Sequence, residues 1–135
     1  MMTFTFDLTP QDDGSLLITS PDFRNLVLEA ATETDALDLA RHAAEEAVSM
    51  AILGGGRLPA SRPHGKAPNR HRISLPDRLA TKAKLYQLCQ HSDLPFEQLA
   101  RSAGLTPEKL ADLIDPREQA DTDHLDRLIA RFQNM

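Results

Sequence analysis

The first thirty residues alternate between apolar and polar side chains with the period of two that is typical of half-buried strands. Residues 3–9 place phenylalanine or leucine at every second position, and residues 15–20 repeat the alternation with leucine and isoleucine. The Asp-Asp-Gly segment at 12–14 predicts a hairpin turn, because glycine readily adopts the positive φ of tight turns. A Pro-Asp pair at 21–22 ends the second strand, and residues 26–30 predict a third. These segments together predict a small antiparallel meander.

A long helix with a narrow face of small side chains is predicted after the meander. Thr32 and Asp35 have the spacing of a capping box, in which both side chains satisfy free amides of the first turn. Glycines at 54–56 end the helix. Such a narrow face lets the helix lie close against the sheet. The apolar positions recur every three or four residues and are Ala36, Leu37, Ala40, Ala43, Ala44, Ala47, Val48 and Ala51.

The next segment, residues 55–76, lacks apolar periodicity and is rich in glycine and proline, which predicts a linker. Within it, residues 70–75 could add a short strand. We therefore expect a domain at 1–54, a linker at 55–76 and a second domain at 77–135. The expected fold class is α+β, with a small antiparallel sheet and one packed helix followed by an all-α domain.

Four short helices are predicted in the second domain from the spacing of apolar residues. They lie near 77–92, near 96–103, around Leu110 with Pro116 closing the helix, and over 125–132. Short helices with short connections predict a compact bundle.

The segment from Gln98 to Ile114 carries the sharpest local pattern. A helix ends at Gly104, a short turn follows, and Thr106 with Pro107 starts the next helix as its N-cap and first-turn proline. This order predicts a helix-turn-helix motif that binds duplex DNA. A helical hairpin used only for dimerisation is the alternative.

In a DNA-binding helix-turn-helix, the first turn of the second helix enters the major groove, while flanking residues contact phosphates. Contacts in the groove are expected from Thr106, Glu108, Lys109 and Asp112, and phosphate contacts from Gln98, Arg101 and Arg117. Such proteins gain operator affinity as dimers, so we expect a homodimer or higher oligomer. The expected apolar dimer seam is Leu125, Leu128, Ile129 and Phe132, for which an intradomain core is the alternative.

The net charge of −5 is unevenly distributed along the chain. Residues 1–54 carry two Lys/Arg and ten Asp/Glu, a net of −8, whereas residues 55–135 carry thirteen and ten, a net of +3. The tract from 57 to 84 holds eight bases and one acid. This asymmetry predicts different partners for different segments, the alternative being ordinary solvated surface. The basic tract is either an arm that contacts duplex backbone or a solubilising linker.

The sequence contains few residue patterns that would indicate a catalytic site. Asp7, Asp12 and Asp13 offer carboxylates for a metal-dependent nuclease, but the last two lie in a turn where aspartate is expected anyway. The histidines are scattered, and the glycines at 54–56 lack the lysine and hydroxyl residue of a phosphate-binding loop. We expect no enzyme activity, no metal and no cofactor. With a single cysteine, Cys89, and neither a signal peptide nor a membrane span, we expect a cytoplasmic protein.

The whole layout resembles the HicB family of antitoxins, in the subgroup that ends in a helix-turn-helix. The resemblance rests on the segments at 13–23, 32–40, 79–86 and 98–117, which cover both halves of the chain. It implies a partial ribonuclease-H-like domain without nuclease carboxylates, which masks a HicA-type mRNA-cleaving toxin, and a C-terminal domain that binds operator DNA to repress the operon.

The sequence departs from that family by lacking a glycine after Phe23 and by its acidic second motif helix. A stand-alone transcriptional regulator whose first domain senses something other than a toxin is the alternative function. A nuclease with weak activity is a third.

Overall fold

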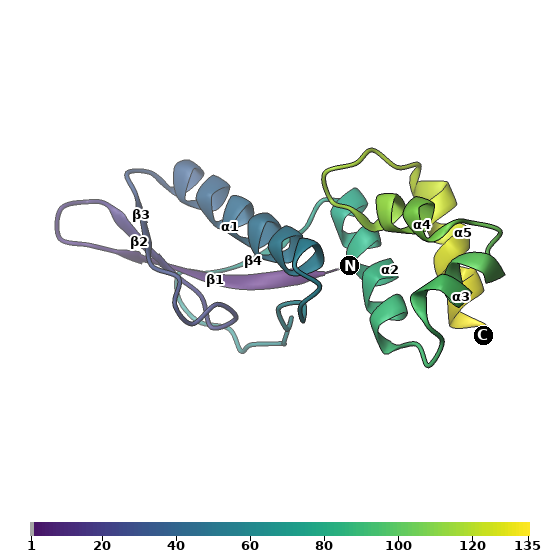
Figure 1. Ribbon diagram of the computed structural model, residues 1–135. Helices are drawn as coiled ribbons and strands as arrows, with labels where there is room; N and C mark the ends of the chain where they lie inside the picture. The colour runs from purple at the N-terminus through teal and green to yellow at the C-terminus, as the bar shows by residue number, and fades with distance from the viewer. Residues whose placement is uncertain (1) are drawn as a thin grey trace. The chain divides into compact units, whose positions relative to one another are not determined.

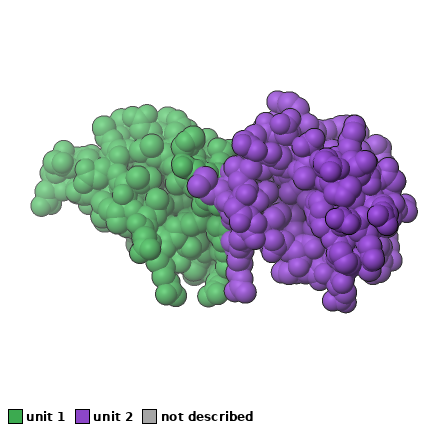
Figure 2. Space-filling model, in the orientation of Figure 1, with its two compact units in different colours: residues 1–48, 59–75 green, residues 49–58, 76–135 purple. Residues whose placement is uncertain are grey.

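The computed structural model describes residues 2–135 and divides the chain into two compact units, coloured separately in Figure 2. Unit 1 contains Met1–Val48 and Pro59–Leu75, and unit 2 contains Ser49–Leu58 and Pro76–Met135. Unit 1 holds a four-stranded antiparallel sheet with one helix, and unit 2 is helical (Figure 1). The α+β class is therefore confirmed.

The sheet of unit 1 has the strand order β3-β2-β1-β4. Its strands are β1 (Thr3–Pro10), β2 (Leu16–Thr19), β3 (Leu28–Ala30) and β4 (Arg70–Ser74). The predicted meander forms the first three strands. At the β1–β2 turn Gly14 has a φ of +87°, and the Asp13 carboxylate accepts a hydrogen bond from the Ser15 amide at 3.0 Å. The turn thus uses the positive φ and the aspartate that the sequence predicts there.

Helix α1 (Glu33–Leu53) runs along the sheet (Figure 1). The Thr32 hydroxyl caps the helix as predicted by accepting a hydrogen bond from the Asp35 amide at 3.2 Å, which is one of the two bonds of the expected capping box. Its buried face is a four-residue repeat of fully buried side chains: Ala36, Ala40, Ala44 and Val48. The sheet contributes buried side chains from alternate positions of β1 and from β2: Phe4, Phe6, Leu8 and Ile18. Small helix residues facing large strand residues form the core of unit 1.

Strand β4 changes the expected domain boundaries. It pairs with β1 from Thr3↔Ser74 to Asp7↔Arg70, so residues 59–75, which the sequence assigned mainly to a linker, belong to the first unit. Unit 1 carries six Lys/Arg and ten Asp/Glu, a net of −4, and unit 2 carries nine and ten, a net of −1. The strong contrast between an acidic first part and a basic second part of the sequence is therefore much weaker between the two folded units.

Unit 2 contains α2 (Asp77–His91), α3 (Phe96–Ser102), α4 (Pro107–Ile114) and α5 (Thr122–Gln133). Helix α2 packs against α4 and α5, and α3 packs against α4. The Asp121 carboxylate caps α5 by accepting a hydrogen bond from the Asp123 amide at 3.1 Å. The four predicted helices are thus confirmed. Among residues 2–135, no helix combines the length and the apolar character needed to cross a membrane.

The side chains expected to form a dimer seam lie inside unit 2. Their exposed fractions in the single chain are Leu125 0%, Leu128 5%, Ile129 5% and Phe132 8%. They repeat along the face of α5, the helix that packs against α2. The intradomain core that the sequence left as an alternative is therefore what the structure shows, and a homodimer would use other surfaces.

Lys82 on α2 is a fully buried charged residue of the same unit. Its ammonium donates hydrogen bonds to the carbonyl oxygen of Asp115 and, at 2.6 Å, to that of Glu118. Asp115 is the C-cap of α4, where free carbonyls are expected to need donors. Lys82 therefore fixes the end of α4 to α2.

Candidate nucleic-acid interface

Helices α3 and α4 are joined by a tight turn at residues 103–106. Gly104 adopts a φ of +72°, its amide donates to the Arg101 carbonyl at 2.9 Å, and the Leu105 amide donates to the Ala100 carbonyl at 2.9 Å. This pair of bonds is a Schellman motif, which ends a helix at a residue in the left-handed region. Glycine at 104 takes that conformation without the steric cost of a Cβ. The turn is thus built as the sequence predicts.

Helix α4 starts with the predicted cap. The Thr106 hydroxyl accepts a hydrogen bond from the Lys109 amide at 3.2 Å, and Pro107 occupies the first turn, where its missing amide hydrogen costs nothing. Leu110 and Ile114 are buried, and they fix which face of α4 points inward. Polar side chains remain on its other face.

The structure leaves all seven predicted DNA-contacting residues exposed, and they lie on α3, on α4 or in the adjoining turns: Gln98, Arg101, Thr106, Glu108, Lys109, Asp112 and Arg117. Arg101 and Lys109 have no ion-pair partner among residues 2–135. Helix α4 itself carries one lysine and two acids, so its exposed face has no net positive charge. Attraction to phosphate must then come from individual cations and not from a positive field.

Arg117 is exposed but already engaged. Its guanidinium binds both carboxylate oxygens of Asp115, with Nε–Oδ1 at 3.1 Å and Nη2–Oδ2 at 2.8 Å. The Arg117 amide also donates to the same carboxylate at 2.9 Å. These bonds lower the pKa of Asp115 to about 2, and the pKa of Arg117 is raised by the same pairing. A phosphate contact by Arg117 would compete with this pair, which the sequence did not reveal.

We expect the substitution Arg117→Gln to raise the pKa of Asp115 from about 2 toward the ordinary value of 3.8. A carboxyl group whose pKa is lowered by folding stabilises the fold above its unfolded pKa, so this contribution is lost as the pH falls from about 4 to about 2. Carbon-detected NMR of the carboxyl groups measures the midpoint directly. Arg127→Gln, on the exposed side of α5, is the control. An unchanged Asp115 midpoint in the Arg117 variant would contradict the pairing.

Sequence reasoning missed the role of Lys82. A signal was present, because residue 82 lies three positions after Leu79 and four before Tyr86, on the apolar stripe of α2. A lysine on such a stripe has to find acceptors if it is buried. Which acceptors it meets depends on the loop after α4, more than thirty residues away along the chain.

Residues 2–135 contain no group of three or more histidine, cysteine, aspartate or glutamate side chains placed to hold a metal ion. The polar face of α4 and the turn before it are the part of unit 2 for which the sequence predicts nucleic-acid contacts. A search with protein-family models and a search of curated proteins both find no match to this chain.

Proposed function

We propose that this chain is an antitoxin of the HicB type, which masks a HicA-type mRNA-cleaving toxin with unit 1 and represses its own operon by binding duplex DNA with unit 2. The observation that carries the proposal is the α3–turn–α4 arrangement, with its Schellman turn at Gly104 and its Thr106 cap. Helix-turn-helix motifs join two helices by such a short turn and place the second helix in the major groove.

The exposed side chains of α4 suit the reading of base edges. Lys109 can donate to the acceptors of guanine, and Glu108 can accept from the amino group of cytosine. Unit 2 has a net charge of −1, so non-specific attraction to DNA is expected to be weak. Operator binding would therefore depend strongly on a few direct contacts.

We expect Lys109→Ala to cost about 1 to 3 kcal/mol of binding free energy on the operator, with little change on random duplex. Arg101→Ala is expected to weaken both duplexes alike and to lower the log-log salt slope by about one unit, as loss of a phosphate contact does. Fluorescence anisotropy with the gene's own upstream region measures both. Arg131→Ala on α5 is the control for loss of one charge. Equal operator binding by the Lys109 variant and the unaltered chain would show that α4 is not the reader.

The toxin-binding role of unit 1 rests on the family resemblance and on charge. Exposed acids cluster on the β1–β2 turn and on the first half of α1: Asp12, Asp13, Glu33, Asp35 and Asp38. A basic RNA-binding toxin surface would be complementary to them, which speeds encounter and fixes register.

The ribonuclease-H-like assignment of unit 1 is part of the same proposal. It is supported by the three-stranded meander, the helix that follows and the fourth strand beside β1. The direction of β4 departs from the usual βαβ unit, in which a helix connects two parallel strands. Helix α1 connects β3 to β4, and β4 is antiparallel to β1 and therefore also to β3. The segment between α1 and β4 reverses the chain direction.

Co-expression with the protein encoded by the neighbouring small reading frame tests the toxin role. We expect the two proteins to co-purify at low salt and to bind less tightly as salt rises, because part of the attraction is screened. If the first unit is tested alone for toxin binding, the fragment should end at residue 75, because a fragment that ends at residue 54 lacks β4. If the chain binds its operator but co-purifies with no toxin, the result favours the stand-alone regulator instead.

A further inference from the structure

Unit 1 contains an open pocket of about 350 Å³ that neither DNA reading nor toxin masking explains. Strand residues and the segment before β4 line it: Thr5, His64, Gly65, Lys66, Ala67, Arg70 and Arg72. Thr5 lies opposite Arg72, and Asp7 lies opposite Arg70, in the β1–β4 register. Directly paired residues of antiparallel strands share one face, so the two arginines and Thr5 lie together.

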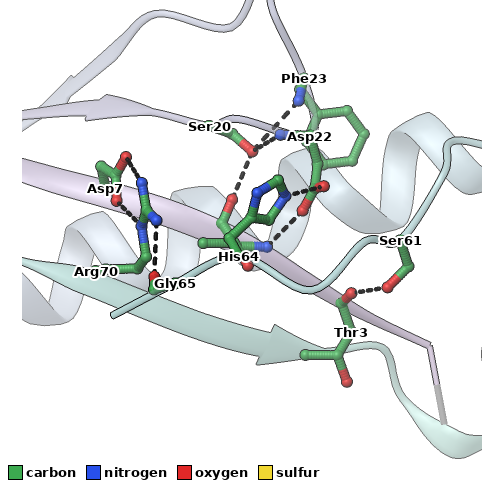
Figure 3. Close-up of polar contacts among 10 residues, drawn as sticks. Thr3, Asp7, Ser20, Asp22, Phe23, Ser61, His64, Gly65 and Arg70 are labelled. Carbon is green, nitrogen blue, oxygen red and sulfur yellow. Dashed lines mark hydrogen bonds and ion pairs between the residues drawn. The ribbon is translucent and has the colours of Figure 1, made fainter. Parts of the chain in front are cut away.

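The floor of the pocket is fixed where β2 stops pairing with β1. Continuing the β1–β2 register beyond Asp7↔Thr19 would place Pro21 opposite Thr5, and Pro21 has no amide hydrogen to donate. The Ser20 hydroxyl donates to the Thr5 carbonyl instead, and the Asp22 carboxylate accepts from the Thr5 amide at 2.8 Å (Figure 3). Two side chains thus replace the missing strand partner, and Thr5 is held in place.

One wall of the pocket is the segment that precedes β4. His64 Nε2 lies 2.8 Å from the second oxygen of Asp22, whose side chain is only 1% exposed (Figure 3). The Ser61 hydroxyl donates to the Thr3 carbonyl and anchors the same segment to β1. His64 is therefore oriented by a buried carboxylate, with its other ring nitrogen left for a ligand or water.

The cations of the pocket divide into two kinds. Arg70 is held on three sides, with Nε and Nη2 on the Asp7 carboxylate at 2.8 and 3.1 Å and Nη1 on the Gly65 carbonyl at 2.8 Å (Figure 3). Its charge is balanced by Asp7. Lys66 and Arg72 are exposed and have no ion-pair partner among residues 2–135. The pocket consequently has two positive charges without an ion-pair partner, and the nearest carboxylate besides Asp7 is the buried Asp22 behind His64.

We propose that this pocket binds a phosphate-type oxyanion between Arg72 and Lys66, with the Thr5 hydroxyl as a further donor. A planar guanidinium binds two oxygens of a phosphate at once, and an ammonium adds a charge-assisted bond. The fixed Arg70 and His64 shape the site and reduce the ordering cost of binding. The same chemistry would accept free phosphate or a phosphodiester of a nucleic-acid backbone. This inference does not depend on the antitoxin proposal.

Titration of the full ¹⁵N-labelled chain with inorganic phosphate, at constant ionic strength adjusted with chloride, tests the site. We expect saturable shifts of the amide signals of Thr5, Gly65, Lys66 and Ala67. Arg72→Gln should weaken phosphate binding by roughly tenfold or more, the loss expected for one hydrogen bond between charged groups. Lys66→Gln, in an exposed loop, is the second variant and should also weaken phosphate binding, because it removes the other proposed cation. Arg24→Gln removes the same charge from unit 1 outside the pocket and should change the affinity less than twofold.

A second series of the same titration uses a short duplex and a single-stranded oligonucleotide. Shifts of the pocket amides with an oligonucleotide, lost in Arg72→Gln, identify the nucleic-acid backbone as the source of the phosphate. Shifts with inorganic phosphate alone identify a free phosphate. Unmoved pocket amides with every probe would overturn the proposal, and so would equal losses of affinity in the Arg72 and Arg24 variants, because these would indicate general screening.

Discussion

Replacing Lys82 with methionine is expected to destabilise unit 2 by about 2 to 3 kcal/mol, although methionine is apolar and similar in size. The loss arises because the carbonyls of Asp115 and Glu118 keep their need for a donor after the ammonium has gone. Removing a buried charge recovers some desolvation cost, which keeps the net loss below that of a broken buried ion pair. The end of α4 should become less ordered, and with it the exposed face that we propose to read DNA.

The single tyrosine, in a chain without tryptophan, makes this measurement specific. Tyr86 lies buried on α2, so its fluorescence during urea unfolding reports on unit 2. Lys84→Met, exposed on the same helix, is the control and should change the stability by less than about 0.5 kcal/mol. A Lys82 variant as stable as the control would mean that water satisfies both carbonyls.

The pH dependence of the same variant has a defined sign. Burial lowers the pKa of Lys82 from its ordinary value of 10.5, with Arg78 adding to the effect and the carboxylates of Asp115 and Glu118 opposing it. The unfolded chain then binds the proton more tightly, so stability rises with pH in the window below about 10.5. The stability difference between the unaltered chain and Lys82→Met should therefore grow between neutral pH and pH 10, and a constant difference would contradict it.

Replacing Asp22 with alanine is expected to lower the stability of unit 1 by about 2 to 3 kcal/mol. The substitution leaves the amide of Thr5, a buried residue, without an acceptor and removes the charge-assisted bond to His64. With His64 released, the segment before β4 keeps fewer links to β1. Hydrogen exchange of the Thr5 amide should accelerate by at least tenfold, which native-state exchange detected by NMR measures residue by residue.

Asp22→Asn separates the two contacts. The amide oxygen can still accept from Thr5, so exchange at that residue should stay close to that of the unaltered chain, while the charged contact with His64 is lost. Asp12→Ala, on the exposed β1–β2 turn, controls for removal of one acid from the same unit. Equal exchange at Thr5 in the alanine variant and the unaltered chain would show that Asp22 does not secure this edge of β1.

Local sequence patterns determined the elements of this protein. Strand alternation in residues 3–9 and the Thr32 cap identify β1 and the start of α1, because both depend on neighbours within a few residues. The Schellman turn is equally local, since Gly104 meets a requirement of its own backbone. The exposure of the polar residues on α4 follows from the spacing of Leu110 and Ile114 on its opposite face.

Only the tertiary structure decided which elements share a sheet or a core. Arg70–Ser74 is a short, basic strand whose partner lies more than sixty residues earlier, and no local pattern identifies that partner. Because of this pairing, four basic residues belong to the acidic unit, and the pocket around Arg72 forms beside β1. Likewise, the apolar face of α5 could cover another protomer or its own bundle, and packing against α2 decided for the bundle. An apolar or charged pattern predicts that a surface is covered or paired, whereas its partner is selected by the long-range arrangement of the chain.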